Sequence, residues 1–372
     1  MSEVGRIAVV GGGVVGLSVA WWLAAAGYPT TLVDPRPKRG ASWVAGGMLA
    51  PVTESWPGEE DALELGRASL DQWPEFAARL TRAGGDPGLR HEGTLALAMD
   101  SADVGTLAML ADHLRDRGRE VHRLSGRELR GLEPTLGSSV RSGLHVPGDL
   151  AVDNRALLTA LHAACVRSGV EFVTVSADTV HPGGVELTDK STVECAVVVI
   201  AAGAWSGALH PALHGLVRPV KGEILRLRTR RGALPVPTRT IRAHVESRPI
   251  YLVPRVDGEL VLGATQQDVG FDEDVTAGAV RDLLRDAERV LPGIAEYALT
   301  ETAAGLRAGS PDNLPLIGEL EPGVLVASGH HRNGLLLAPI TAAAVLSLVR
   351  EEELPERLRA ACPSRFGVEV PT

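Results

Sequence analysis

Apolar positions in the first part of the chain predict a strand, a helix and a second strand. Residues 7–10 form a continuous apolar run, which is typical of a buried strand. Apolar residues then recur at helical spacing from Val14 as far as Gly27, which ends the predicted helix. A second apolar run at 31–33 predicts another strand, which ends at Asp34. This order of elements is typical of the beginning of an α/β domain.

Helical and strand patterns continue to alternate along the next part of the chain. Helical spacing recurs in four segments, at 59–83, 102–118, 126–131 and roughly 154–168. Strands are predicted in three segments, at 95–99, at 170–175 and within 194–205. The last of these segments contains a continuous apolar run, which indicates a strand covered on both faces, as in a parallel sheet.

The pattern changes between Arg218 and about Thr302. This block predicts antiparallel-looking strands at 221–227, 250–253 and 260–263. The earlier pattern then returns, with a strand at 323–329 and a final helix near 339–350. The sequence therefore predicts an α/β fold, in which a Rossmann-like domain is interrupted by an antiparallel-sheet domain.

A length of 372 residues suits two domains. From the changes of pattern we expect the Rossmann-like domain to comprise residues 1–80, 145–215 and 303–360. We expect the interposed domain to comprise residues 81–144 and 216–302.

The segment 11–16, Gly-Gly-Gly-Val-Val-Gly, joins the first predicted strand to the helix and predicts a dinucleotide site. Gly11 allows a tight turn, Gly13 lets the backbone approach a pyrophosphate, and Gly16 lets the helix pack close to the sheet. The first N–H groups of the helix and its dipole favour phosphate binding. Asp34 can accept hydrogen bonds from ribose hydroxyls, and its charge would repel a 2′-phosphate, which argues against NADP.

Other readings of the chain are weaker. No charged residue occurs between Arg6 and Asp34, so a membrane span or signal peptide is an alternative, but the glycine cluster and Pro29 interrupt it. A net charge of −9 argues against nucleic acid as a partner. The cysteines have no CxxC or metal-ligand spacing, and this usage suggests the reducing cytoplasm; they are Cys165, Cys195 and Cys362.

Several motifs, in order along nearly the whole chain, resemble the flavin-dependent D-amino-acid oxidase family, and within it the glycine oxidases of the thiamine pathway. The most specific is 41–51, Ala-Ser-Trp-Val-Ala-Gly-Gly-Met-Leu-Ala-Pro. Further matching segments are 219–223 (Pro-Val-Lys-Gly-Glu), 251–255 (Tyr-Leu-Val-Pro-Arg), 261–265 (Val-Leu-Gly-Ala-Thr), 305–312 (Gly-Leu-Arg-Ala-Gly-Ser-Pro-Asp) and 329–334 (Gly-His-His-Arg-Asn-Gly).

This resemblance implies non-covalently bound FAD and the oxidation of glycine, sarcosine or small D-amino acids to an imine. O2 would be reduced to H2O2, and the imine would yield glyoxylate and ammonia or supply the thiazole moiety of thiamine. Related sarcosine oxidases attach their flavin through a cysteine, and this chain has none between Cys195 and Cys362. The resemblance also implies a homotetramer and a hand-off to a thiazole-forming enzyme. A D-amino-acid dehydrogenase with a non-oxygen acceptor remains an alternative, as does a flavoprotein without turnover.

The resemblance and the glycine turn together predict the residues that contact FAD. They are Gly11, Gly13, Val14, Val15, Gly16, Asp34, Pro35, Ala41, Ser42, Gly46, Gly47, Met48, Asp178, Ala202, Gly203, Trp205, His330, His331, Arg332, Asn333, Gly334, Leu335 and Leu336. Asp178 is the least direct of these predictions, because it rests on counting seven residues from Glu171 and on a backbone contact only.

Oxidation at an α-carbon requires a bound carboxylate, and an arginine matches that group in planar, bidentate fashion. We expect Arg307 to bind the carboxylate, from a bend between Gly305 and Gly309. Tyr251 is expected to close over the substrate, and Arg332 to reach it. The other predicted pocket residues are Met48 and Gln266, where the polar amide departs from the methionine of glycine oxidases and leaves the substrate preference open. The pair at 330–331 does not predict a metal site, since no third ligand lies nearby in sequence.

Overall fold

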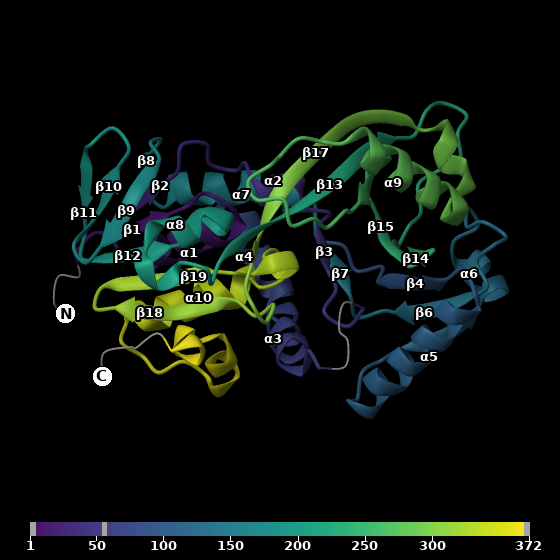
Figure 1. The fold of residues 1–372 in the computed structure, drawn as a ribbon, viewed down its shortest axis with the longest axis horizontal. Coiled ribbons are helices and arrows are strands. Elements are labelled where there is room, and N and C mark those ends of the chain that lie inside the picture. Colours follow the sequence, from purple (N-terminus) through teal and green to yellow (C-terminus); the bar gives the residue numbers. More distant parts are fainter. Residues whose placement is uncertain (1–4, 54–57, 368–372) are drawn as a thin grey trace.

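Two large sheets lie side by side in the protein, whose computed structural model describes residues 5–53 and 58–367 (Figure 1). The first has six strands, in the order β18 (Leu316–Glu321), β19 (Val324–Ser328), β12 (Val197–Ile200), β1 (Ile7–Val10), β2 (Thr30–Val33) and β8 (Glu171–Val173). All neighbouring pairs are parallel except β18 and β19. The carboxyl ends of β1, β2, β12 and β19 therefore meet at one edge.

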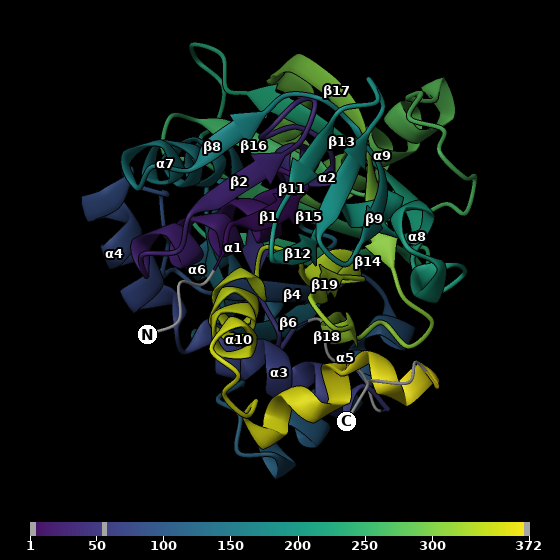
Figure 2. The same cartoon turned by 90° about the vertical axis from the view of Figure 1, so that its left-hand side faces the viewer.

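Both faces of this sheet are covered, as the apolar run in β12 predicted. Val199 packs into the core formed with the helices, whereas Val198 and Ile200 pack into the core on the other face. The helices of the first core are α1 (Val14–Ala25), α3 (Glu60–Leu70), α4 (Trp73–Ala83), α7 (Asn154–Arg167) and α10 (Ala338–Val349). The second core is completed by α8 (Ser206–Leu209) and by a small antiparallel sheet of β9 (Ala177–His181), β10 (Gly184–Leu187) and β11 (Thr192–Glu194). Figure 2 shows α4 and α7 on one flank and α8 on the other.

The second sheet has eight strands, drawn from two separate stretches of the chain. Their order is β17 (Ala298–Gly309), β13 (Arg218–Arg228), β16 (Glu259–Gly263), β15 (Arg248–Pro254), β14 (Thr240–Val245), β4 (Thr94–Ala98), β6 (Ser142–Val146) and β5 (His122–Ser125). Only β4 and β14 are parallel. The long strands β13 and β17 run from this sheet toward the parallel one (Figure 1).

Helices cover the eight-stranded sheet on both faces. Leu95 and Leu97 of β4 pack into the core of α9 (Ala277–Val290), whereas Ala96 and Ala98 pack into the core of α5 (Ser101–Asp116). This alternation follows from the opposite directions of successive side chains in a strand. The remaining α-helices and strands of the described chain are α2 (Ala41–Val44), β3 (Met48–Leu49), α6 (Gly126–Leu132) and β7 (Leu150–Ala151).

The predicted mixture of parallel and antiparallel sheets is confirmed, with differences in individual elements. The segment 59–83 forms two helices, α3 and α4, because the chain turns at Asp71 and Gln72. Pro74, in the first turn of α4, favours a new helix start there. The sequence did not predict the helices α2, α8 and α9 or the strands β3, β5–β7, β9–β11, β14, β17 and β18. None of the helices in the described ranges is long and apolar enough to cross a membrane.

Arg307 lies within a strand, which corrects the predicted bend between Gly305 and Gly309. It belongs to β17 and pairs with Val220 of β13. The two glycines allow close packing: a Cβ on Gly305 would lie 3.1 Å from Val44 Cβ, and one on Gly309 would lie 2.9 Å from a methyl group of Val220. Because β17 pairs along most of its length, this pairing outweighs the local tendency of glycine to bend the chain.

Candidate functional site

The glycine turn after β1 is shaped by close backbone packing. Gly11 has a φ of +112°, and a Cβ there would overlap the carbonyl group of Ala201. A Cβ on Gly16 would overlap the carbonyl oxygen of Gly11, so α1 can begin directly against the turn only without a side chain. The Gly11 N–H donates to the Val33 carbonyl at 2.9 Å and ties the turn to β2.

The amino end of α1 has the features of an anion-binding site. Its first turn has no acidic residue, and Gly13 offers no side-chain cap. The Val14 N–H donates to Ser42 Oγ at 3.1 Å, and a Cβ on Gly13 would lie 3.3 Å from the same oxygen. The positive end of the helix dipole and the small residues Gly13 and Ser42 therefore leave space for a phosphate group.

Asp34 lies at the carboxyl end of β2 and shapes the neighbouring turn. Its Oδ2 accepts a hydrogen bond from the Gly12 N–H at 2.6 Å, and its Oδ1 accepts one from the Arg36 N–H at 2.7 Å. Each carboxylate oxygen has a second lone pair, so the same group can also accept hydrogen bonds from ribose hydroxyls.

A pocket of about 370 Å³ brings these residues together with distant ones. It opens at the carboxyl ends of β1, β2, β12 and β19, where ligands of α/β sheets bind. Fifteen of the residues predicted to contact FAD or substrate line it: Gly11, Gly13, Val14, Val15, Asp34, Pro35, Ala41, Ser42, Ala202, Gly203, Trp205, Arg307, His330, His331 and Gly334. The glycine turn and the predicted carboxylate-binding residue therefore share one cavity.

Arg307 carries a positive charge into this pocket without a carboxylate partner in the described part of the chain. Its Nη1 donates to the carbonyl of Thr265 at 3.2 Å and to that of Lys221 at 3.4 Å. No ion pair involves it within residues 5–53 and 58–367. Because a partly buried cation is costly to leave unpaired, this position favours the binding of an anionic group.

Tyr251 lies on β15, against the segment that connects α2 to β3. A Cβ on Gly46 would lie 2.6 Å from the Tyr251 ring, and a Cβ on Gly263 would overlap the ring. Met48 packs in the same small apolar cluster as Tyr251. The ring thus rests on two glycines, although neither Tyr251 nor Met48 is part of the wall of the pocket just described.

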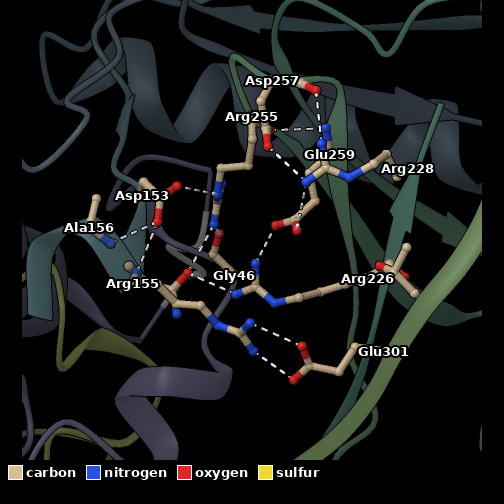
Figure 3. Close-up of polar contacts among 12 residues, drawn as sticks. Gly46, Asp153, Arg155, Ala156, Arg226, Arg228, Arg255, Asp257, Glu259 and Glu301 are labelled. Carbon is tan, nitrogen blue, oxygen red and sulfur yellow. Dashed lines mark hydrogen bonds and ion pairs between the residues drawn. The ribbon is translucent and has the colours of Figure 1, made fainter. Parts of the chain in front are cut away.

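Behind this segment lies a buried ionic cluster that sequence reasoning did not anticipate (Figure 3). Arg255 is only 4% exposed, and burial lowers the pKa of its guanidinium to about 10. Its Nη2 donates to the Gly46 carbonyl at 2.8 Å and to Asn154 Oδ1 at 3.1 Å. Asn154 Nδ2 in turn donates to the carbonyls of Ser42, at 2.9 Å, and Trp43, at 2.8 Å. The cluster therefore fixes the segment that carries Ser42 and Gly46.

The charges in this cluster are paired. Arg226 forms an ion pair with Glu259, and its Nη2 donates to Asn154 Oδ1 at 3.1 Å. Arg155 forms a bidentate pair with Glu301, at 3.0 and 2.6 Å (Figure 3). The only signal in the sequence was the position of Arg255 in a family-like segment, which does not reveal its contacts.

The predicted residues that follow β19 have different surroundings. His330 is buried, its Nε2 lies 3.0 Å from Thr341 Oγ1, and burial lowers its pKa to about 3. The pKa of His331 is lowered to about 4, mainly by burial and further by Arg307 and Arg332. Arg332 Nη2 pairs with Glu59 Oε2 at 2.8 Å, and Arg332 is not part of the pocket wall.

Several other predicted residues lie outside the pocket wall. Gln266 is exposed on the loop after β16. Asp178 is also exposed and pairs with Lys190 at 3.3 Å, whereas Ser176 and Ala177 line the pocket and were not predicted. The rest are Gly16, Gly46, Gly47, Asn333, Leu335 and Leu336, of which the two leucines belong to the core next to α10. Across the ranges that the structure describes, no group of three or more His, Cys, Asp or Glu could hold a metal ion.

These features fit FAD. Any side chain at position 11 or 13 would enter the space that the glycine turn leaves open. The amino end of α1 offers N–H groups to a pyrophosphate, and Asp34 can accept hydrogen bonds from ribose hydroxyls. The pocket continues past the carboxyl end of β12 to Arg307 and Gly334, where a flavin ring would lie beside the substrate.

Comparison with known proteins agrees with this assignment. The model of the family described as FAD dependent oxidoreductase matches residues 6–348. The chain is 35% identical to a thiamine biosynthesis oxidoreductase ThiO of Rhizobium etli, over 95% of this chain and 99% of that protein. It is 31% identical to the bifunctional protein ThiO/ThiG of Trichormus variabilis, over 98% of this chain but only 56% of that protein. The chain thus spans about half the length of the bifunctional relatives that it matches.

The fold is also similar to solved structures. The crystal structure of glycine oxidase from Geobacillus kaustophilus superposes with a TM-score of 0.87 and 31% identity, covering 97% of this chain and 99% of that one. The family match, the relatives that match over nearly their full length and the glycine turn after β1 all indicate an FAD-binding protein. The chain belongs to the FAD-dependent oxidoreductase family, with FAD as its cofactor.

Proposed function

We propose that the protein oxidises glycine, and also sarcosine and small D-amino acids, to the corresponding imine. Hydrolysis of the imine from glycine yields glyoxylate and ammonia, and O2 accepts the two electrons to give H2O2. FAD, held non-covalently, supplies the two-electron chemistry. The names of the Geobacillus kaustophilus and Rhizobium etli proteins support an amino-acid substrate and a link to thiamine biosynthesis.

The observation that carries this proposal is the position of Arg307. Its guanidinium has no carboxylate partner in the described residues and lines the same pocket as the glycine turn. A bidentate pair with a carboxylate would hold an amino acid in a fixed orientation, and orientation is the main task of the protein when a cofactor carries the electrons. With the pKa of His331 lowered to about 4, that side chain is neutral near pH 7, so the positive charge at this point is that of Arg307.

Other residues have supporting roles in the proposal. Tyr251 closes the substrate space against Gly46, and Met48 forms an apolar wall beside it. Arg332 and Gln266 are assigned to the rim, where each could contact substrate after a change of side-chain rotamer. In this proposal the parallel sheet and its helices form the FAD-binding domain and the eight-stranded sheet forms the substrate domain, which β17 extends past the expected boundary at residue 303 to Gly309.

We also propose a homotetramer in the cytoplasm that passes its imine to a thiazole-forming enzyme. The fused ThiO/ThiG relatives support a functional link between two such activities, because fusion keeps two proteins together. Gel filtration with light scattering would measure the oligomeric state.

The test of the proposed function is product formation by the purified yellow protein under air. Glycine should yield glyoxylate, ammonia and H2O2 in equal amounts, and sarcosine and D-alanine should also react. Turnover with an artificial electron acceptor but without H2O2 would instead favour a D-amino-acid dehydrogenase. A flavin that no small amine reduces would indicate a protein without turnover and would refute the proposal.

A further inference from the structure

The proposed function does not explain three consecutive residues of β13, Lys221–Glu223, which lie next to Arg307. Lys221 and Glu223 are fully buried and charged, and Gly222 lies between them. We propose that the segment Lys221–Glu223 and Thr265 form a cradle that orients Arg307 toward the substrate. This inference rests on the proposed role of Arg307 as the carboxylate-binding residue.

Gly222 provides the space in which the guanidinium lies. A Cβ on Gly222 would overlap both terminal nitrogens of Arg307. Any side chain at this position would therefore push the guanidinium away from the strand. Since Gly222 has no positive φ, its value lies in the absence of a side chain and not in backbone freedom.

Two carbonyl groups hold one edge of the guanidinium. Arg307 Nη1 donates to the carbonyls of Lys221 and Thr265. Within the described residues, Nη2 and Nε make no hydrogen bond, which leaves two donors for a carboxylate. An arginine whose planar group is held in advance loses less freedom when it binds its ligand.

Thr265 is fixed by Glu223 through reciprocal hydrogen bonds. Thr265 Oγ1 accepts from the Glu223 N–H at 2.9 Å and donates to Glu223 Oε2 at 3.0 Å. Glu223 Oε1 accepts from the Thr276 N–H at 2.7 Å, and so the carboxylate also holds the far end of the loop. Removing the Thr265 hydroxyl should loosen the carbonyl that Arg307 contacts.

Lys221 offsets the charge of the buried Glu223 carboxylate. Its Nζ lies 3.9 Å from Glu223 Oε1 and 2.7 Å from Asp272 Oδ2. A buried charge is stable only when it is paired, and here the lysine balances Glu223 on the side of β13 opposite Arg307. Thr265 and Glu223 are therefore positioning residues, which act on the substrate through Arg307.

The first experiment measures the affinity for acetate, a carboxylate that cannot be oxidised as an amine, from the change in flavin absorbance of the FAD-loaded protein. Thr265→Val should raise the Kd about tenfold, the effect of losing one well-placed hydrogen bond, whereas Thr265→Ser should leave it near the wild-type value. In steady-state assays Thr265→Val should raise KM for glycine more than it lowers kcat. FAD content and Tm serve as the checks on folding.

A double-mutant cycle tests whether Thr265 acts through Arg307. In an Arg307→Ala background, Thr265→Val should no longer change the Kd for acetate. Equal weakening in both backgrounds, or none in either, would overturn the cradle while leaving the role of Arg307 intact. If Arg307→Ala itself leaves the Kd unchanged, the proposed carboxylate-binding role fails, and the cradle fails with it.

Gly222→Ala provides a second test that does not depend on Thr265. The added methyl group should raise the Kd for acetate at least tenfold while FAD remains bound, since the turn that binds FAD lies on the other sheet. Gly105→Ala is the matched control, because a Cβ on Gly105 meets nothing within 4 Å. An unchanged Kd in folded Gly222→Ala would overturn the proposal.

Discussion

Arg255 and Arg307 both belong to or border strands of the eight-stranded sheet, yet their surroundings differ in kind. Arg255 is 4% exposed and lies among carboxylates, an asparagine and backbone carbonyls that bind it (Figure 3). Arg307 is only partly buried, lines the pocket and contacts two carbonyls but no carboxylate in the described chain. We therefore propose that the first arginine stabilises the fold and that the second binds an anion.

This difference shows how the protein separates support from binding. Burial of a charge is costly, so a structural arginine needs a full set of partners. An arginine that binds a ligand instead keeps some of its N–H donors free for that ligand, so the protein holds only one edge of its guanidinium. Substitutions of each arginine and of the residues around it test this difference.

The largest effect is expected for Arg255→Ala. This change removes the buried cation that pairs with Asp153 at 3.6 Å and leaves the Gly46 carbonyl without its donor, so the free energy of unfolding should fall by about 3–5 kcal/mol. FAD retention should fall as well, because the segment 42–46 loses its support. Urea unfolding measures the loss. The control Arg281→Ala removes an exposed pair with Asp282, away from the cluster, and should cost less than about 1 kcal/mol. Equal losses in the two variants would contradict a structural role for Arg255.

Arg307→Ala should show the opposite profile. Loss of two charge-assisted hydrogen bonds to the substrate should raise KM for glycine about a hundredfold or more, with FAD still bound. Steady-state kinetics and the flavin spectrum measure the two quantities. Stability should stay within about 1 kcal/mol of the wild type. Unchanged kinetics in Arg307→Ala would remove the distinction between the two arginines.

The pH dependence of stability tests the histidines beside Arg307. The pKa values of His330 and His331 are lowered from 6.5 to about 3 and about 4. Between these values and 6.5 the unfolded chain binds more protons, so their contribution is complete above about pH 6.5 and is lost as the pH falls. The loss should be on the order of 1–3 kcal/mol per histidine at pH 4. His330→Gln should flatten the curve, and the control His214→Gln, at an exposed site, should not. A curve that His330→Gln leaves unaltered would argue against this assignment.

The smallest effect is expected for Tyr251→Phe. Removing the hydroxyl while keeping the ring over Gly46 should raise KM for glycine about three- to tenfold, as for one lost hydrogen bond. Tyr28→Phe is the control, because Tyr28 follows α1 and packs against the core of the other sheet. An unchanged KM would indicate that Tyr251 only packs against Gly46 and Gly263 and does not bind the substrate.

The two regions also differ in how far the sequence predicted them. The glycine turn, α1 and Asp34 form one continuous segment whose spacing reflects local geometry, so their arrangement could be predicted. Arg307 was identified by its chemistry and by family resemblance, but its strand was not, because pairing between β13 and β17 depends on residues about 80 positions apart.

The ionic cluster could not be predicted for the same reason. Asn154 contacts Ser42 and Arg255, and no local pattern links these three positions. Ser176 and Ala177 line the pocket because β8 ends nearby, a placement that counting along the chain missed by one or two residues. Long-range pairing, not composition, determines these parts of the site.

The most direct test of the central claim is an anaerobic titration of the FAD-loaded protein with glycine, followed at the visible flavin band. Glycine should bleach the band, and Arg307→Ala should require about a hundredfold more glycine for the same bleaching. The proposal that Arg307 holds the substrate carboxylate beside FAD would be contradicted by either of two results: a wild-type flavin that stays yellow at saturating glycine, or bleaching of both proteins at equal glycine concentrations.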